Sequence, residues 1–514
     1  MAVLVALGGV CPAHGQAVRP FESEAWSVLA NGVDTRVLAA LQKKGLEPAQ
    51  PCSDEVFIRR VYVDAIGTLP EPSEVREFLQ DGRADKREAL VEALLQREEF
   101  TEYWTLKWGD LLRVKAEFPV NLWPNAVQAY HRWIWEAVKE NRPYDEFARE
   151  LLTSSGSNFR VPPVNFYRAV QGREPSALAE AVALTFMGTR LASWPADKRA
   201  DLAAFFSRVA YKKTGEWKEE IVYPDLTATE PLDVVFPDGT KASIAPGEDP
   251  RLAFADWLIR PENPWFTRNI ANRVWAWLFG RGIIHEPDDI RPDNPPSNPE
   301  LLAYLEQELV SAKYDLRHLY RLILDSRTYQ QSPIPQSNGP EAEALFACYP
   351  MRRMDAEVLI DALDWVGGTG ENYSSPVPEP FTYVPEDQRS IQLADGSITS
   401  LFLEMFGRPP RDSGLESERS NQPSDAQRLY LLNSTDVQRR IARSPWVRRA
   451  AITANGDRAE LVRGVYIALL SREPTPAEEA AAEQYWQTPG IGPEDAATDL
   501  AWALINSMEF LYRH

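Results

Sequence analysis

The chain contains the stretch Phe57-Ile-Arg-Arg-Val-Tyr-Val-Asp-Ala-Ile-Gly-Thr-Leu-Pro70, in which apolar residues recur every three and four positions. This spacing predicts a helix that ends before a turn punctuated by proline. A second stretch, Val462-Arg-Gly-Val-Tyr-Ile-Ala-Leu-Leu470, repeats the first at a constant offset. Each copy predicts a helix, a turn with two prolines and two further helices. An aromatic residue just past the last helix is expected to pack against that helix. The echo indicates two related helical units, with independent convergence on the same spacing as the alternative.

The same spacing runs through most of the chain and predicts a mainly α, multi-helical protein. Residues 214–247 differ, because two short alternating runs flank Asp238-Gly239, which is the pattern of a β-hairpin. We therefore predict two helical halves separated by a small β insert. Their ranges are 50–213 for the N-terminal domain, 214–247 for the insert and 248–514 for the C-terminal domain, which includes a long loop over 367–414. The spacing predicts helices over 56–66, 73–79, 86–95, 126–139, 144–152, 175–187, 197–209, 250–259, 265–279, 298–311, 316–326, 355–366, 424–433 and 458–470.

The composition excludes several classes of protein. The 514 residues carry 55 basic and 75 acidic side chains, a formal charge of −20. A chain this acidic is repelled by phosphate backbones, which argues against nucleic acid as a partner. The apolar content of 44% is enough for buried cores and excludes wholesale disorder. After the N-terminal segment no apolar run approaches the ~20 residues of a membrane span, so no transmembrane segment is predicted.

The N-terminus predicts export. Residues 2–10 form a short apolar run, and small residues follow at 13–17. This pattern predicts a signal peptide over 1–17 and a periplasmic or extracellular location, with a buried N-terminal strand as the alternative. The exported chain would keep only Cys52 and Cys348, which lie too far apart in sequence to indicate a disulfide framework. Whether these two pair is left open.

The first stretch, together with Trp104-Thr-Leu-Lys-Trp-Gly-Asp-Leu-Leu-Arg113, resembles the planctomycete cytochrome-associated (PSCyt-type) domain, a domain of unknown function. Further along, Asn272-Arg-Val-Trp-Ala-Trp-Leu-Phe-Gly-Arg-Gly-Ile-Ile284 and Arg352-Arg-Met-Asp-Ala-Glu357 are similar to its usual C-terminal companion, the PSD-type domain. The likeness covers roughly residues 50–514. It implies an exported protein whose biochemical activity is unassigned.

The chain departs from that family at one place that matters. Many relatives carry Cys-x-x-Cys-His, which resembles a c-type haem attachment site. The corresponding stretch here is Leu191-Ala-Ser-Trp-Pro195, which has neither the thiols nor the histidine. A Cys-x-Cys that some relatives carry before Glu418-Arg-Ser420 is missing too. We therefore predict no haem and no cofactor at these positions, and electron transfer is disfavoured; calcium is considered separately below.

One helix combines aromatic and charged residues. Trp104 and Trp108 form an apolar stripe, while Lys107, Asp110 and Arg113 follow three-residue steps along a neighbouring face. Such a ladder of charges is typical of a structural row of ion pairs. The functional alternative is the polar wall of a cleft with an aromatic floor.

His131 is the histidine with the best claim to chemistry. It lies in the helix predicted over 126–139, which is dense in aromatic residues. One interpretation is a partly buried structural histidine whose ring nitrogens have hydrogen-bond partners. The other is a general acid or base whose pKa the aromatic wall tunes.

The segment 153–168 looks suited to recognition. Asn158, Arg160 and Arg168 stand among short hydroxyl side chains and aromatic rings. Arginine and amide groups in such a setting bind carboxylates, sulfates or sugar hydroxyls. The equal alternative is a connection stiffened by Pro162-Pro163.

The segment 286–294 is rich in oxygen ligands. Asp288, Asp289, Asp293 and Asn294 are hard donors of the kind that calcium accepts, but their spacing fits no EF-hand. Arg291 competes for the same carboxylates. A calcium site and an Arg–Asp network that fixes the loop are therefore both open.

A late segment carries Glu416, Glu418 and Arg419. Paired carboxylates divide acid and base work in glycoside hydrolysis, but these two are too close in sequence to imply the required separation. The favoured alternative is structural, with the arginine locking two domains together.

Three functions follow from these patterns. The first is a binding or scaffold protein for a surface polymer or glycan, because the 16 tryptophans suit stacking against sugars. The second is a polysaccharide hydrolase or lyase that uses Asp110, His131 and Asp288 as catalytic residues. The third, electron transfer, is disfavoured. The oligomeric state is not predicted. The ligand-binding residues that we expect in either of the first two cases are Trp108, Arg113, Asn158, Arg160, Arg168, Asp289, Arg291, Glu418 and Arg419.

Overall fold

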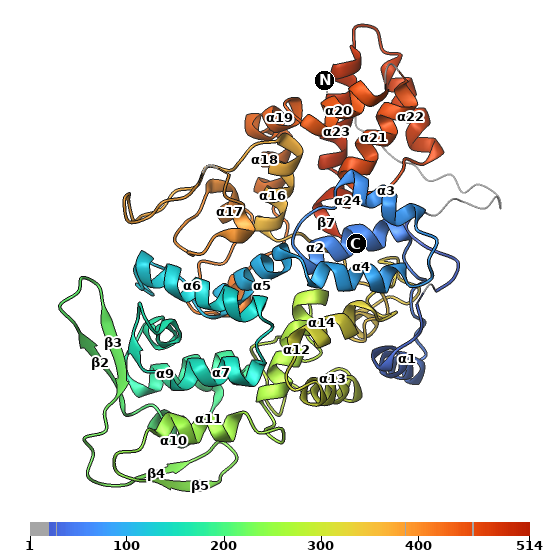
Figure 1. Ribbon diagram of the computed structural model, residues 1–514. Coiled ribbons are helices and arrows are strands. Elements are labelled where there is room, and N and C mark those ends of the chain that lie inside the picture. Colours follow the sequence, from blue (N-terminus) through green and yellow to red (C-terminus); the bar gives the residue numbers. More distant parts are fainter. Residues whose placement is uncertain (1–19, 27, 386, 455–456) are drawn as a thin grey trace.

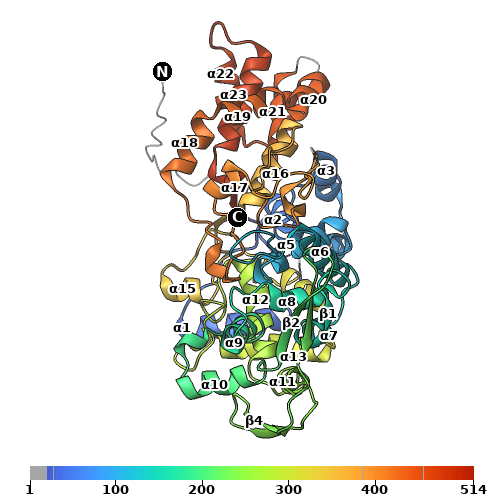
Figure 2. The ribbon, with the colours of Figure 1, turned by 90° about the vertical axis from the view of Figure 1, so that its left-hand side faces the viewer.

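The computed structural model describes residues 20–26, 28–385, 387–454 and 457–514. The predicted signal peptide lies outside these residues. The fold is mainly α, as predicted, and its sheets have only two or three short strands. The molecule is elongated, with the strands of residues 209–244 toward one end and the helices of residues 445–505 at the other (Figure 1, Figure 2).

The first part of the chain is helical up to residue 204. Its helices are α1 Gly32–Lys44, α2 Asp54–Ala65, α3 Pro72–Gln80, α4 Lys86–Leu95, α5 Glu98–Leu111, α6 Pro124–Lys139, α7 Tyr144–Thr153, α8 Asn165–Arg168, α9 Pro175–Val182 and α10 Ala196–Ala204. The helix predicted over 175–187 continues beyond α9 as a π-helical turn, 183–187, which ends at Gly188 with a left-handed φ of 61°. The prediction of a helix over 197–209 is wrong at its end, because α10 stops at Ala204.

Short strands follow α10. The antiparallel strands β2 Val209–Lys213 and β3 Glu220–Pro224 are joined at the edge of β3 by β1 Gly156–Ser157. Strands β4 Leu232–Val235 and β5 Lys241–Ile244 form the hairpin that Asp238-Gly239 predicts. Because β1 comes from the segment after α7, the β region is hydrogen-bonded to the N-terminal half.

The second part of the chain is helical again. Its helices are α11 Pro250–Leu258, α12 Phe266–Phe279, α13 Pro299–Ser311, α14 Leu316–Leu324, α15 Pro340–Ala344, α16 Ala356–Gly367, α17 Leu401–Met405, α18 Asp425–Asn433, α19 Thr435–Ala442, α20 Pro445–Ala454, α21 Arg458–Leu470, α22 Pro476–Trp486, α23 Pro493–Ile505 and α24 Met508–Leu511. The strands β6 Arg352–Arg353 and β7 Tyr512–Arg513 pair antiparallel near α2 (Figure 1). None of the described helices is both long and apolar enough to cross a membrane.

The two halves share one core. The Trp277 ring of α12 lies 5.5 Å from that of Trp104 and 5.8 Å from that of Trp108, both on α5. Helix α1 packs on α13 in the same way, joining the N-terminal half to the C-terminal half. Side chains that are far apart in sequence are therefore brought together where α5 meets α12.

The internal echo is present as structure. In the first copy, α2, α3 and α4 follow the predicted order, and Arg97 joins two acids, reaching Glu74 at 2.8 Å and Glu99 at 2.7 Å. The Arg97 guanidinium also lies 5.5 Å from the centre of the Tyr62 ring. Glu74 accepts a hydrogen bond from the backbone N–H of Glu71, so it also caps α3.

The second copy repeats these contacts with a different arginine. Glu478 and Glu509 stand at the positions of Glu74 and Glu99, and Arg472 joins them at 2.8 Å and 2.6 Å. Its guanidinium lies 5.2 Å from the ring of Tyr466. Since the same tyrosine and two acids recur in both copies, the echo extends beyond hydrophobic spacing to a shared polar tie.

Candidate functional site

A cleft of about 560 Å³ opens where the two halves meet. We call it the cleft. Its walls come from α5, α12, the strands β6 and β7, and the segments 285–287 and 416–423. Its charged and aromatic lining residues are Lys107, Trp277, His285, Glu286, Arg352, Arg353, Asp355, Glu416, Arg419, Tyr512 and Arg513.

Asp355 forms the floor of the cleft at the start of α16. Its carboxylate accepts hydrogen bonds from Lys107 Nζ at 2.7 Å, from Arg513 Nη2 at 2.9 Å and from Asn421 Nδ2 at 2.7 Å. The Tyr103 hydroxyl donates to it at 3.0 Å. Burial raises the pKa of this carboxyl, but the surrounding cations outweigh burial and hold the pKa well below its usual value. Asp355 is therefore ionised at any physiological pH.

Asp64 on α2 is a second buried anchor. Its Oδ1 accepts from Arg352 and from Arg513, each at 2.9 Å. Its Oδ2 accepts from the hydroxyls of Tyr329 and Tyr349 at 2.8 Å and 2.7 Å. Arg513 thus bridges Asp64 and Asp355 and fixes β7 against α2.

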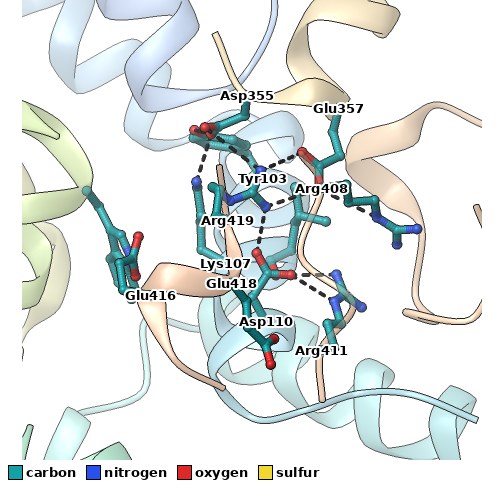
Figure 3. Close-up of polar contacts among 12 residues, drawn as sticks. Tyr103, Lys107, Asp110, Asp355, Glu357, Arg408, Arg411, Glu416, Glu418 and Arg419 are labelled. Carbon is teal, nitrogen blue, oxygen red and sulfur yellow. Dashed lines mark hydrogen bonds and ion pairs between the residues drawn. The ribbon is translucent and has the colours of Figure 1, made fainter. Parts of the chain in front are cut away.

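Asp110, Glu357, Arg411 and Arg419 form a group that we call the arginine cluster. Arg419 binds both oxygens of Glu357, at 2.6 Å and 3.0 Å, and it also reaches Asp110 at 2.6 Å. Arg411 approaches Asp110 from the other side at 2.8 Å, so that Arg419 lies between the two acids (Figure 3). Burial raises the pKa of Asp110, but Arg419 and Arg411 lower it by more than burial raises it. The pKa therefore lies below its usual value, and the carboxylate stays ionised. The cluster is therefore a set of mutually paired charges, extended by Arg408 at 3.6 Å from Glu357 and by Asp355 at 3.8 Å from Arg419.

The cleft itself has unused cationic donors. Five basic side chains and three acidic ones line it, a local excess of positive charge in a chain of charge −20. Arg353 is 4% exposed and uses Nη2 to donate to the carbonyls of Phe406 and Ser420. Its Nε and Nη1, and Nε of Arg513, have no hydrogen-bond partner among the described residues. Buried donors left without a partner point to a ligand or water that supplies acceptors.

Glu416 is the acid of the cleft that is least neutralised. Its carboxylate accepts from Trp277 Nε1 at 3.2 Å, and Arg273 Nη1 lies 3.6 Å away. Burial raises the pKa of this carboxyl, and Arg273 and Lys107 offset only part of the rise. The carboxyl therefore takes up a proton more readily than its neighbours, which suits an acid–base group.

The three charged residues that the sequence places along one face of α5 lie in three different places in the structure. Lys107 reaches the cleft, Asp110 lies in the arginine cluster, and Arg113 is buried near a separate pocket. Trp108 is 3% exposed, and its ring packs against Tyr144, Phe147 and Trp277 as part of the core behind the cleft.

His131 is half-buried on α6 and does not line the cleft. Burial, followed by the charge of Arg411, lowers its pKa to about 3. At neutral pH the imidazole is therefore uncharged.

The segment 153–168 lies away from the cleft, beside the β region. Asn158 donates to the carbonyl of Lys218 at 3.2 Å and accepts from the backbone N–H of Glu220 at 2.9 Å. Arg168 pairs with Glu220 at 3.1 Å. Arg160 is exposed. Asn158 and Arg168 therefore tie β3 to the N-terminal half.

The segment 286–294 contains two separate ion-pair sets. Asp288 is buried and pairs with Arg273 at 2.6 Å, and it also accepts from the backbone N–H of Glu416 at 2.6 Å. Arg291 lies 3.2 Å from Asp289 and 3.5 Å from Asp293, which is the predicted Arg–Asp network. Within the described ranges, no three His, Cys, Asp or Glu side chains gather as a metal site.

The segment 416–419 connects several predicted residues. Its Glu416 N–H reaches Asp288 and its Arg419 reaches Asp110, while Glu418 accepts from the backbone N–H of Ser413 at 2.6 Å. Asp110, Asp288, Glu418 and Arg419 are thus brought together through one segment. Trp108, Arg160 and Asp289 are not, and none of these three lines the cleft.

Sequence reasoning missed several residues of the site. Asp64 and Arg513 each join several residues of the site, but in the sequence they stand only as parts of a helical stretch and of the C-terminal stretch. A signal existed for Asp64, because the helical spacing places this charge among buried apolar residues of α2. A charge on an apolar face needs a partner, but the spacing does not say which one.

The two cysteines do not pair. Cys52 and Cys348 are both free thiols, the first buried and the second half-buried. The sequence left open whether Cys52 and Cys348 form a disulfide, and in the structure they do not.

Two family models match the chain. PSCyt2, a protein of unknown function (DUF1549), matches residues 32–208, and PSD1, a protein of unknown function (DUF1553), matches residues 250–486. Searches of curated proteins and of solved structures gave no match. The cleft is lined by residues of both matched regions and by β7. The chain therefore carries a region that matches the PSCyt2 model followed by a region that matches the PSD1 model, in the order that the sequence predicts.

Proposed function

We propose that the chain is an exported binding protein whose cleft takes an acidic segment of a surface polysaccharide, bearing carboxylate or sulfate groups. The observation that carries the proposal is the positive lining of the cleft, with the unpartnered guanidinium donors of Arg353 and Arg513. Guanidinium groups bind carboxylates and sulfates through two parallel hydrogen bonds. The predicted signal peptide supports the exported location.

The walls of the cleft suit a sugar ring. Trp277 and Tyr512 contribute aromatic surface beside the cations, and Asn421 offers an amide oxygen without a partner. The volume of about 560 Å³ lies within the range of roughly 300–1,000 Å³ that small-ligand sites occupy. Aromatic rings for stacking, cations for the acidic group and an amide for hydroxyls are the elements that acidic-sugar recognition requires.

The test is calorimetric titration of the whole protein with alginate and chondroitin sulfate oligosaccharides, and with neutral cello-oligosaccharides of equal length. We expect binding of the acidic sets only, weakening as sodium chloride is raised. Arg353→Met should weaken binding at least tenfold. Arg449→Met is the matched control, since Arg449 is exposed on α20 and lies over the Trp446 ring.

Two outcomes would overturn the proposal. One is that no acidic oligosaccharide binds to the folded protein. The other is that neutral and acidic oligosaccharides bind equally well, because the cations of the cleft would then contribute nothing to recognition.

A second candidate function is a polysaccharide hydrolase or lyase, and Glu416 is the observation that favours it. Its raised pKa and its place in the wall of the cleft suit a proton donor. The predicted catalytic residues Asp110 and Asp288 are instead held in ion pairs with arginine. Glu416→Gln should abolish the release of reducing ends from the bound polymer while leaving its affinity unchanged. If the wild-type protein releases none, this candidate is discarded.

A further inference from the structure

A second pocket lies away from the cleft and contains Arg113. It has a volume of about 340 Å³ and lies between α9, the segment 190–192 and the segment 412–415; we call it the Arg113 pocket. Most of its wall is apolar, formed by Val170, Ala177, Ala181, Leu184, Leu191 and Leu415. The acids Glu180 and Asp412 line it too, and Asp412 is paired with Lys115 at 2.6 Å. Arg190 stands at the same pocket, with its side chain 41% exposed.

Arg113 differs from most buried arginines of the described chain. Arg87 pairs with Asp54 at 2.7 Å, and Arg273 pairs with Asp288 at 2.6 Å. Arg113 is 3% exposed, yet no described carboxylate lies within ion-pair distance of it. The nearby Glu418 is engaged instead with the backbone N–H groups of residues 412 and 413.

The guanidinium of Arg113 is also poorly hydrogen-bonded. Its Nη1 makes only two long contacts, to the carbonyls of Leu111 at 3.4 Å and Ser413 at 3.5 Å. Its Nε and Nη2 have no partner among the described residues. The ring of Phe166 lies 5.4 Å away, and the nearby Tyr130 and Glu418 offset part of the lowering of the Arg113 pKa that burial causes. A guanidinium stays charged in a protein, and a buried charge without a counter-ion is strongly unfavourable.

We propose that the Arg113 pocket binds a small carboxylate with an apolar body, of the size of an aromatic or medium-chain organic acid. The carboxylate pairs with Arg113 and supplies the acceptors that its Nε and Nη2 lack. The apolar body packs on the wall formed by α9 and Leu191. A mostly apolar pocket with a small number of placed polar groups is the usual design for such a ligand.

The site is independent of the proposed glycan cleft. The segment 412–420 separates them, with Ser413 and Leu415 facing the Arg113 pocket and Glu416 and Arg419 facing the cleft. A variant of one site can therefore be used as a control for the other.

The experiment is calorimetric titration of the full chain with 3-phenylpropionate and octanoate, and with the corresponding amides. We expect the acids to bind and the amides to bind at least tenfold more weakly. Arg113→Met should remove most of the difference between acid and amide. Ala177→Phe should block acid binding by filling the pocket without altering the arginine, and Arg353→Met should leave it unchanged.

Folding of the variants is checked by denaturant unfolding. Because Arg113 has no acid partner, Arg113→Met should keep the wild-type midpoint. A loss of stability as large as that of Arg411→Met would show a structural arginine and overturn the proposal. Equal binding of acid and amide, or undiminished acid binding by Arg113→Met, would overturn it as well.

Discussion

The arginine cluster and the two open arginines, Arg353 and Arg113, use the same side chain in opposite ways. In the cluster, Arg411 and Arg419 saturate Asp110 and Glu357 with short ion pairs. Arg353 and Arg113 are similarly buried, but among the described residues neither has a carboxylate within ion-pair distance and each has two donor atoms without an acceptor. An arginine paired with buried acids stabilises the packing of distant segments, whereas a buried arginine without a counter-ion is unfavourable by itself, which is the reason for the two binding proposals made above.

The largest effect should come from breaking the cluster. Arg419→Met leaves Asp110 and Glu357 buried with fewer counter-charges, so we expect a loss of about 3–5 kcal/mol of unfolding free energy. Urea unfolding followed by circular dichroism measures it. Arg449→Met provides the exposed control, and an Arg419→Met midpoint equal to that of the control would show that the cluster is not stabilising.

Asp355 extends the comparison to pH. Its pKa in the folded protein is well below the unfolded value near 3.8. The stability that Asp355 contributes is therefore fully present above pH 3.8 and is lost as the pH falls from there through the folded pKa. Asp355→Asn should cost about 2 kcal/mol at pH 7. The cost should shrink steadily below pH 4, as measured by urea unfolding over a series of pH values. A cost that does not depend on pH would contradict this assignment.

The two repeat copies allow the same comparison for a smaller effect, between two arginines that make equivalent ion pairs but differ in exposure. Arg472 is 5% exposed, while Arg97 in the equivalent tie is 32% exposed. Solvent weakens the exposed pair, so Arg472→Met should cost about 1–2 kcal/mol and Arg97→Met less than about 1 kcal/mol. Paired urea titrations of the two variants decide this, and the reverse order would mean that burial does not set the strength of the tie.

Asp325 is the converse case, an acid with no ion pair among the described residues, although the charge of Arg321 offsets part of the rise in its pKa. Burial and the neighbouring Glu88 raise its pKa to about 7, and its Oδ1 has no hydrogen-bond partner among the described residues. Because the folded pKa lies above the unfolded value, the carboxyl destabilises the fold increasingly as the pH rises from about 4 to 7. Asp325→Asn should therefore raise stability at pH 8, by about 1 kcal/mol after allowing for partial exposure. Thermal unfolding should show no gain at pH 4.

Local patterns in the sequence predicted the parts of the fold that depend on near neighbours. Helical spacing predicted α2 and its echo α21, and Asp238-Gly239 predicted the β4–β5 hairpin, because each depends on residues a few positions apart. The end of α10 at Ala204 was misplaced, because the apolar residues up to Val209 continue the spacing while the backbone leaves the helix to form β2.

The site was harder to predict than the fold, for the same reason. Asp110, Asp288 and Arg419 were identified as charged residues worth attention, and they do lie within connected ion pairs. Their partners Arg411 and Arg273 are separated from them by between 15 and 301 residues, and charge alone does not select among the 55 basic side chains. The pairing depends on how the segment 411–419 folds against α5 and how the segment that carries Asp288 folds against α12.

The bond between Arg513 and Asp64 has a consequence for how the protein is made. These residues are 449 positions apart, and Arg513 donates to Asp64 at 2.9 Å in the middle of the molecule. The ribosome releases Asp64 long before it adds Arg352, and longer still before it adds Arg513, the two arginines that neutralise it. The first domain to emerge therefore holds an incompletely neutralised acid in its interior until translation is nearly finished, and it reaches its final stability only with the whole chain.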